Sequence, residues 1–118
     1  MQSKRVNTVI NKMIKDQEVY NLLLNIPLGN VATYGDLAKA LDHPSASRLI
    51  GKILGRNPNP VKVPCHRIVL SNGKLGGYIH GIAKKKELLE KEGILFKNNT
   101  TIYDFKNVRF CPQHTNSN

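Results

Sequence analysis

Residues 33–56 read TYGDLAKALDHPSASRLIGKILGR, and their apolar residues recur with the period of two short helices. The first set shares one face of a helix: Tyr34, Leu37, Ala38 and Leu41. The second set forms an apolar stripe on a helix predicted over 45–55: Ala46, Leu49, Ile50, Ile53 and Leu54. Thr33 and Asp36 have the spacing of a capping box, and Pro44 suits the first turn of the second helix. Two short helices joined by a few residues predict a helix-turn-helix.

The polar face of the second predicted helix is basic and carries small residues. The side chains opposite the apolar stripe are Ser45, Arg48, Lys52 and Arg56, with Gly51 at the edge. Such a face on the second helix is typical of DNA-binding helix-turn-helix motifs. An ordinary pair of helices with a solvated basic face would show the same pattern. The spacing alone leaves both interpretations open.

The segments on either side of this pair predict two further helical regions. Residues 6–26 have helical periodicity, either as one long helix or as two short ones with Asp16 as the cap of the second. A last helix is predicted over 82–92, and Gly93 is expected to stop it.

A β-hairpin is predicted between these helices. Asn72-Gly73 is a strong turn signal, and it separates the extended residues 68–70 from Lys74-Leu75. A hairpin that follows a helix-turn-helix is called a wing. The expected fold is therefore mainly α with a small β-hairpin, similar to a winged helix-turn-helix.

Composition limits the classes of protein to which the chain can belong. It has 118 residues, enough for one domain, and its hydrophobic fraction of 40% is sufficient for a folded core. No run of about 18 apolar residues predicts a membrane span, and the N-terminus lacks the features of a secretory signal. With two Cys residues, the chain is expected to be cytoplasmic with reduced thiols, or nuclear in a eukaryote. Eighteen Lys and Arg against eight Asp and Glu give a net charge of +10, which favours a polyanionic partner such as nucleic acid.

Cys65 lies in the stretch VPCHRIV, residues 63–69, between a proline and a predicted strand. A free Cys is often plain core, but the neighbours His66 and Arg67 favour a reactive thiol, because a cationic setting stabilises the thiolate. A thiol with a pKa near ~8.5 is mostly protonated at neutral pH, so a proton acceptor is needed. A protease-type pair of Cys65 and His66 is disfavoured, since such partners come from distant positions. The spacing of Cys65, His66 and His80 does not suit zinc, and no metal or cofactor is predicted.

Five ordered motifs resemble one protein family. They are Thr33–Ala38, Asn57-Pro58, Pro64–Val69, Gly76-Gly77-Tyr78 and Leu88–Gly93. Together they are similar to the O6-alkylguanine-DNA alkyltransferases, also called methylated-DNA–protein-cysteine methyltransferases. The resemblance covers roughly residues 16–95 and corresponds to the C-terminal domain of the family. The chain is identified as a short form without the usual N-terminal, RNase-H-like domain. Residues 1–95 are expected to form the winged-helix DNA-binding and alkyl-acceptor domain, and 96–118 a partly disordered C-terminal extension.

The resemblance implies a chemistry for five residues. An alkyl group such as methyl passes from O6 of guanine in DNA to Cys65, which inactivates the protein after a single turnover. His66 is implied to take the thiol proton through a water, and Glu92 to orient and charge that histidine. Asn57 corresponds to the residue that braces the active-site turn. Tyr34 is implied to donate toward the guanine as charge develops, and to crowd the phosphate of the flipped nucleotide.

The implied partner is double-stranded DNA that contains O6-alkylguanine, approached from the minor groove by a monomer. Arg48 corresponds to the arginine that enters the base stack and fills the gap left by the flipped base. Other DNA contacts are expected from Ser47, Gly51, Lys52, Arg56, Lys74 and Lys84 to Lys86. The substrate pocket is expected to include Pro64, Ile68, Tyr78 and Ile79. The backbone at Cys65 and Ile68 is implied to contact the guanine amino group.

Two other functions are compatible with parts of the sequence. Alkyltransferase-like proteins bind alkylated guanine without repairing it and recruit other factors. They share the short form but replace the cysteine, usually with tryptophan, so Cys65 favours a transferase over such a sensor. A plain winged-helix regulator would have no use for the Pro64–Arg67 segment.

Overall fold

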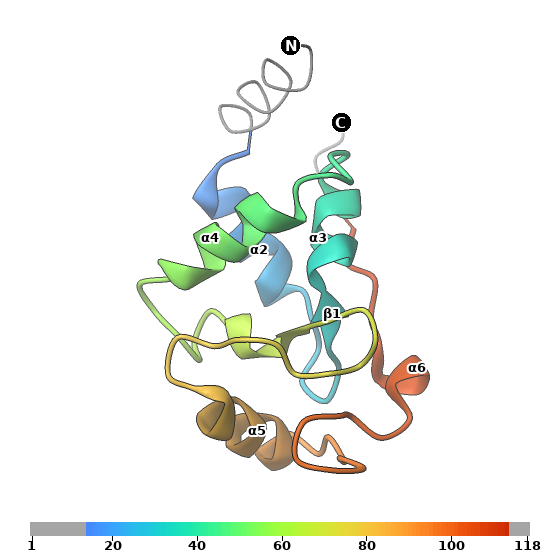
Figure 1. Cartoon of the computed structure of the whole chain (residues 1–118). Helices are drawn as coiled ribbons and strands as arrows, with labels where there is room; N and C mark the ends of the chain where they lie inside the picture. The colour runs from blue at the N-terminus through green and yellow to red at the C-terminus, as the bar shows by residue number, and fades with distance from the viewer. Residues whose placement is uncertain (1–13, 114–118) are drawn as a thin grey trace.

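The computed structural model describes residues 14–113 of the chain. The helices are α2 (Asp16–Leu24), α3 (Tyr34–Ala40), α4 (Ser47–Gly55), α5 (Ile82–Lys91) and α6 (Phe105–Val108) (Figure 1). Two short strands are β1 (Ala32–Thr33) and β2 (Ile68–Val69), and a single 3₁₀ turn covers Cys65–Arg67. The fold is thus mostly helical, as the sequence predicts. The residues before 14, where part of the first predicted helix falls, lie outside the described residues.

Helices α3 and α4 form the predicted helix-turn-helix. The capping box at the start of α3 is present: Thr33 Oγ1 accepts from the Asp36 N–H at 2.9 Å, and the Asp36 carboxylate accepts from the Thr33 N–H at 3.0 Å. Helix α4 begins at Ser47, two residues later than predicted, so Pro44 lies in the preceding turn and not in the helix. The pattern therefore predicted both helices and misplaced one boundary.

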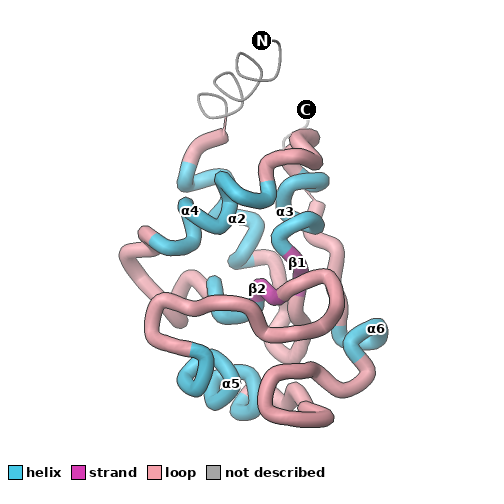
Figure 2. Tube along the Cα trace, in the orientation of Figure 1, coloured by secondary structure: helices cyan, strands magenta, loops and turns pink. Residues whose placement is uncertain are grey.

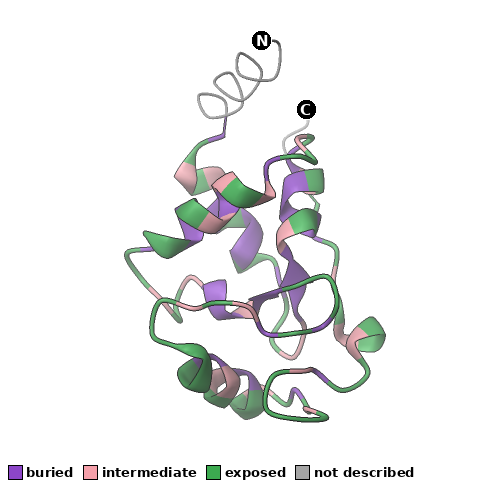
Figure 3. Ribbon diagram, viewed as in Figure 1, coloured by how far each residue is buried: buried purple, intermediate pink, exposed green. Residues whose placement is uncertain are grey.

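The main core lies between α2, α3 and α4. Its most buried side chains include Val19, Leu23, Leu37, Ile50 and Ile53, and Figure 3 shows the buried residues on the facing sides of these helices. The Tyr20 hydroxyl donates to the Ile53 carbonyl at 3.1 Å and ties α2 to α4. Asp16 is the first residue of α2 and not its cap, because Lys15 occupies the capping position. This core holds α4 against the rest of the molecule by its apolar stripe.

The predicted β-hairpin is wrong in its strand pairing. The turn at Asn72-Gly73 does reverse the chain, since the Leu70 N–H donates to the Lys74 carbonyl at 2.9 Å. However, β2 pairs in parallel with β1, with Ala32 opposite Ile68 and Thr33 opposite Val69 (Figure 2). Lys74 instead forms an antiparallel bridge with Thr101, and the Leu75 N–H donates to the Thr100 carbonyl at 2.9 Å. A local turn signal predicts where the chain reverses, but the strand partners come from distant segments.

A second apolar cluster lies beside α5. Its buried members are Val31, Val69, Leu75, Leu89, Ile94 and Ile102. Residues on both sides of position 95 therefore contribute to one cluster, and the described part of the 96–118 extension is packed through Ile102, with Phe96, Phe105 and Val108 partly buried against it. Residues 114–118 lie outside the described part, and the proposed division at 95 stays a prediction. None of the helices within residues 14–113 has the length and apolar character of a membrane span.

Candidate active site

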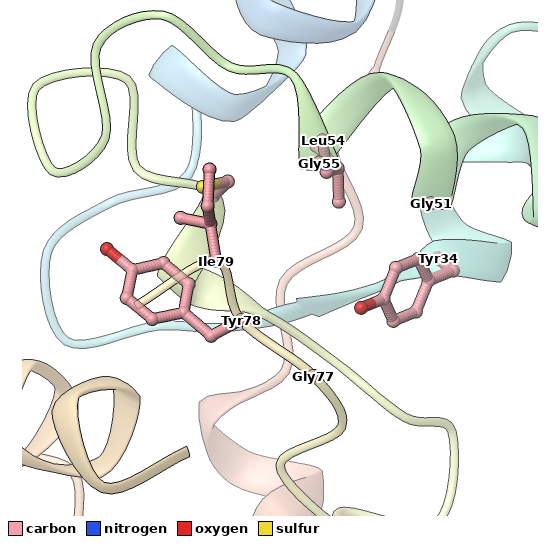
Figure 4. Close-up of a pocket in the computed structure, with 8 residues that line it drawn as sticks. Tyr34, Gly51, Leu54, Gly55, Gly77, Tyr78 and Ile79 are labelled. Carbon is pink, nitrogen blue, oxygen red and sulfur yellow. The ribbon is translucent and has the colours of Figure 1, made fainter. Parts of the chain in front are cut away.

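A cavity of about 330 Å³ lies between α4, the first residue of α3 and the loop before α5. Its lining residues are Tyr34, Gly51, Leu54, Gly55, Cys65, Gly77, Tyr78 and Ile79. Figure 4 shows Tyr34 reaching in from α3, and Tyr78 and Ile79 reaching in from the loop. The structure thus brings Cys65 and Tyr34, which are 31 positions apart in the chain, to one pocket.

The turn that carries Cys65 is braced by Asn57. The Asn57 side chain is buried, its amide N–H donates to the Val63 carbonyl at 2.8 Å, and its oxygen accepts from the Asn59 N–H at 2.9 Å. The Cys65 N–H bonds to the same Val63 carbonyl at 2.8 Å. Asn57 therefore ties the proline-rich loop to Val63, two residues before Cys65.

Cys65 is 6% exposed, and burial raises the pKa of its thiol above the ordinary value. A hydrogen bond from Asn57 and the positive charge of Lys85 partly offset this effect. The expectation that Arg67 makes a cationic setting for the thiolate is wrong, because the Arg67 guanidinium bonds elsewhere. At neutral pH the thiol is protonated, so a base must remove its proton before the sulfur can act as a nucleophile.

His66, Glu92 and Arg67 form a network behind Cys65. The Nε2 of His66 lies 2.8 Å from one Glu92 oxygen. The Arg67 guanidinium binds both Glu92 oxygens, at 2.8 and 3.0 Å, and donates to the Ile26 carbonyl at 2.8 Å. Burial opposes ionisation of Glu92, but the hydrogen bonds from Arg67 and His66 outweigh it and lower its pKa. Arg67 thus keeps Glu92 ionised and in place, a role that the sequence did not indicate.

Burial lowers the pKa of His66 below 6.5, although Glu92 acts in the opposite direction. The ring is therefore neutral at neutral pH. Because ionised Glu92 can only accept, Nε2 carries the proton and Nδ1 is an acceptor. Nδ1 is buried and has no hydrogen-bond partner among the described residues. The arrangement supplies a neutral imidazole with an unpaired basic nitrogen on the residue that follows Cys65 in the chain.

Two tyrosines flank the cavity. Burial raises the pKa of Tyr34, and the nearby Cys65 adds to the effect, so its hydroxyl stays protonated and able to donate. A methyl group added at Gly51 would lie 3.9 Å from the Tyr34 ring, and one added at Gly76 would lie 3.8 Å from its hydroxyl. Tyr78 stands edge-on to His66, with ring centroids 6.4 Å apart. The Tyr34 ring therefore sits between α4 and the loop of residues 76–79.

The outer face of α4 presents the predicted DNA-contact residues. Arg48 and Lys52 are exposed, and Ser47 and Gly51 are partly exposed. Arg48, Gly51 and Gly55 follow the spacing of one helical face, and the two glycines line the cavity. Arg56 differs, because its guanidinium forms a two-point ion pair with Asp16 at 2.7 and 2.9 Å. Of the predicted set, Arg48 is the exposed cation on the face that adjoins the cavity.

The predicted pocket residues divide into two pairs. Tyr78 and Ile79 line the cavity, as predicted. Pro64 and Ile68 are buried and do not line it; Ile68 belongs to β2 and packs in the main core. The period-two alternation of a strand sends the Ile68 side chain inward, while its backbone stays near Cys65. Sequence reasoning missed Leu54, Gly55 and Gly77, whose backbones and short side chains form the cavity walls.

Lys85 is buried, although the sequence predicts an exposed residue. It was predicted to contact phosphates with Lys84 and Lys86, but its side chain is fully buried and its ammonium donates to the carbonyls of Leu75 and Gly77. Burial lowers its pKa to about 8, and the neighbouring Cys65 partly opposes this shift. Its position between Ile82 and Leu89 on the apolar stripe of α5 is the signal that could have indicated burial. Lys85 fixes the loop that carries Tyr78.

The described residues contain no group of three or more His, Cys, Asp or Glu side chains that could hold a metal ion. The side chains of the site are a thiol, an imidazole bonded to a carboxylate, and a phenol.

Comparison with known proteins gives one consistent result. Residues 15–94 match the family model described as 6-O-methylguanine DNA methyltransferase, DNA binding domain. A methylated-DNA–protein-cysteine methyltransferase of Methanosarcina acetivorans is 47% identical over 77 residues, which are 65% of this chain and 49% of that protein. The protein of the same name from Saccharomyces cerevisiae is 49% identical over 76 residues, 64% of this chain and 40% of that one. The chain spans about half the length of the curated relatives that it matches.

Solved structures agree with the sequence comparison. The Mycobacterium tuberculosis OGT in complex with DNA has a TM-score of 0.65 and 44% identity, and the match covers 66% of this chain and 48% of that one. The Schizosaccharomyces pombe Atl1 in complex with damaged DNA containing O6-carboxymethylguanine has a TM-score of 0.70 and 25% identity. That match covers 82% of this chain and 94% of Atl1.

Proposed function

Because the chain belongs to the 6-O-methylguanine DNA methyltransferase family, we propose that it repairs DNA by moving an alkyl group from O6 of guanine to Cys65. The observation that carries the proposal is the cavity that Cys65 lines, with His66, the next residue of the chain, bonded to Glu92. The product is a thioether that the site has no means to cleave. Each molecule therefore acts once, without a cofactor, because the thiol itself is the alkyl acceptor.

The proposed reaction begins with proton transfer. The thiol proton of Cys65 passes, through one bridging water, to Nδ1 of His66, and Glu92 stabilises the imidazolium that results. The sulfur then attacks the alkyl carbon, so that an S–C bond forms while the bond from that carbon to O6 breaks. The electron pair of the broken bond goes to guanine. Tyr34 gives its proton to the guanine as this charge develops, and the proton held by His66 returns to Tyr34 through solvent.

We further propose that the partner is double-stranded DNA approached from the minor groove by a monomer. A thiol in a closed pocket cannot reach a stacked base, so the guanine must be flipped out. Arg48 is positioned on the correct face of α4 to fill the gap, and Ser47, Gly51, Lys52 and Tyr34 are proposed to contact the backbone. Exposed Ile79 lies at the cavity wall and is proposed to limit the size of the alkyl group. A cytoplasmic or nuclear location follows from the DNA substrate and stays a prediction.

A second function is favoured by one observation. The match to Atl1 extends over nearly all of that protein, and the structure of Atl1 contains a damaged duplex. A lesion sensor would bind alkylated DNA in the same cavity and leave the alkyl group on guanine. Cys65 with its base favours transfer, because a sensor needs no nucleophile.

The two functions are separated by a Cys65→Ala variant. Duplex DNA with one O6-methylguanine is incubated with wild type and variant, and both lesion binding and loss of the methyl group from DNA are measured. We expect the wild type to remove up to one methyl group per protein molecule. The variant should remove none and bind the lesion duplex about as tightly as the wild type, since Ala retains the shape of the cavity. Equal binding with no removal by either protein would favour the sensor.

A further inference from the structure

The described residues beyond the family match end in a segment that binds the edge of β1. The Val31 N–H donates to the Val108 carbonyl at 2.9 Å, and the Phe110 N–H donates to the Val31 carbonyl at 2.7 Å. The Asn30 side chain also donates to the Val108 carbonyl at 3.0 Å. Arg109 therefore forms an isolated parallel bridge with Val31, the residue that precedes β1. The paired residue, Val31, lies three residues before Tyr34, where α3 begins.

Arg109 extends this contact to the first turn of α3. Its guanidinium binds both oxygens of Asp36, at 3.0 and 2.7 Å. Asp36 is buried, which opposes its ionisation, but the hydrogen bonds from Arg109 and Thr33 outweigh burial and lower its pKa. Arg109 also lies over the Phe105 ring, 5.8 Å from the ring centroid. A two-point bond to an ionised, buried carboxylate fixes both partners in one geometry.

Asp36 links Arg109 to Thr33, so that hydrogen bonds enclose the backbone at Tyr34. One Asp36 oxygen accepts from Arg109 and also from the Thr33 N–H, at 3.0 Å each. The Asp36 N–H in turn donates to Thr33 Oγ1 at 2.9 Å. Tyr34 and Gly35 are the two residues enclosed by this pair of bonds. Any rotation of the Asp36 carboxylate would loosen the turn from which the Tyr34 side chain enters the cavity.

We propose that Arg109 is a positioning residue for alkyl transfer, which holds the Tyr34 hydroxyl in the cavity through Asp36 and Thr33. The inference rests on the proposed function, because it assumes that Tyr34 takes part in transfer. Arg109 lies outside the cavity and acts only through the first turn of α3. A displacement of about 1 Å at a reacting group can lower a rate by about a hundredfold, so a modest loosening has a measurable effect.

The test compares Arg109→Gln with Lys106→Gln, a matched control. Both changes remove one positive charge from the same segment, and Lys106 is an exposed residue of α6. Single-turnover methyl transfer to Cys65 is measured with an O6-methylguanine duplex at several DNA concentrations. Arg109→Gln is expected to lower the saturating rate about tenfold and to leave the half-saturating concentration unchanged. Lys106→Gln should keep the wild-type saturating rate, and Arg109→Lys should recover part of the loss.

A double-mutant cycle separates positioning from general damage. In a Tyr34→Phe background, Arg109→Gln should have no further effect on the saturating rate, because the hydroxyl that it places is gone. Equal rates for wild type and Arg109→Gln would overturn the proposal. So would a full tenfold loss in the Tyr34→Phe background. If Arg109→Gln does not fold, the same cycle is run with Arg109→Lys.

A spectroscopic measurement distinguishes this inference from the proposed function. The ring resonances of Tyr34 are assigned by their loss in Tyr34→Phe and compared among the variants. A shift in Arg109→Gln without a shift in Lys106→Gln supports positioning, even if the wild type transfers no methyl group and the proposed function is wrong. Unchanged Tyr34 resonances in Arg109→Gln, in a wild type that does transfer, would reject the inference alone.

Discussion

At the scale of single residues, the His66 ring is neutral at neutral pH because burial lowers its pKa below 6.5. The proposed base works only in this form. We therefore expect the saturating transfer rate to stay level between pH 8 and pH 6.5, and to fall as the pH drops through the His66 pKa. The rate is measured in single-turnover reactions at saturating lesion DNA. An inflection clearly above pH 6.5 would mean that another group is the base.

The same pKa predicts how His66 affects stability. A histidine whose pKa is lowered in the folded state takes up a proton first in the unfolded chain. Its contribution to the free energy of unfolding is therefore complete above pH 6.5 and is lost as the pH falls. Glu92 and Asp36 also have lowered pKa values, so their contributions to the free energy of unfolding are likewise lost as the pH falls, but at lower pH. Acid should thus weaken the site and the fold together.

Lys85 predicts a change of stability at alkaline pH. Its pKa is about 8 in the folded protein against an ordinary 10.5, so between these values the unfolded chain binds more protons. The free energy of unfolding contributed by Lys85 should rise by about 3 kcal/mol from pH 8 to above pH 10. The free energy of unfolding is measured by urea denaturation of wild type and Lys85→Met at pH 7.5 and 9.5. The difference between the two proteins isolates the contribution of Lys85, because Cys and Tyr residues titrate in both. A difference between the two proteins that does not change with pH would contradict burial of the charged amine.

The side chains of the site were predictable to different degrees. Cys65, His66, Glu92, Asn57 and Tyr34 were identified from the motifs, and the structure places them together or in bonded pairs around the cavity. Lys85 was predicted to be exposed at the phosphates, and Arg67 to stand beside the thiol, and both predictions were wrong. Their partners are backbone carbonyls and a carboxylate from other segments, which no local pattern reveals.

At the scale of elements, α4 carries two exposed cations, Arg48 and Lys52, for which different DNA contacts are proposed. Arg48→Ala should slow transfer from a duplex about tenfold or more, and change transfer from a single-stranded oligonucleotide with the same lesion by less than about twofold. The reason is that only a duplex has a gap to fill. Lys52→Ala on the same helix serves as the comparison, because loss of a phosphate contact weakens binding to both substrates. Equal losses on both substrates for Arg48→Ala would remove its proposed role in the base stack.

The elements show why local signals sufficed for the helices and failed for the strands. Thr33 and Asp36 are three residues apart, so their capping box could be predicted from the sequence. The apolar stripe of α4 was predicted in the same way. The partner of β2 is β1, more than thirty residues earlier, and the partners of Lys74 and Leu75 are near residue 100. Strand pairing depends on these distant contacts, which a turn signal does not contain.

At the scale of the whole molecule, some of the described residues after 95 pack in the second apolar cluster. Ile102 is 1% exposed and packs in one cluster with Val31 and Leu89. Ile102→Ala should therefore lower the free energy of unfolding by about 3 kcal/mol, the usual cost of emptying a buried Ile site. Urea denaturation measures it, and the m-value should not change if the fold is kept. A loss below about 0.5 kcal/mol, typical of surface positions, would show that the extension is not needed for the core.

Cys65 is the proposed acceptor of the alkyl group. Mass spectrometry tests this directly, on the protein after incubation with duplex DNA carrying one O6-methylguanine, first intact and then as peptides. The proposed function predicts a gain of one methylene on the peptide that contains Cys65, and none on the peptide that contains Cys111. No mass gain in a folded protein that binds the lesion would contradict transfer and favour a sensor.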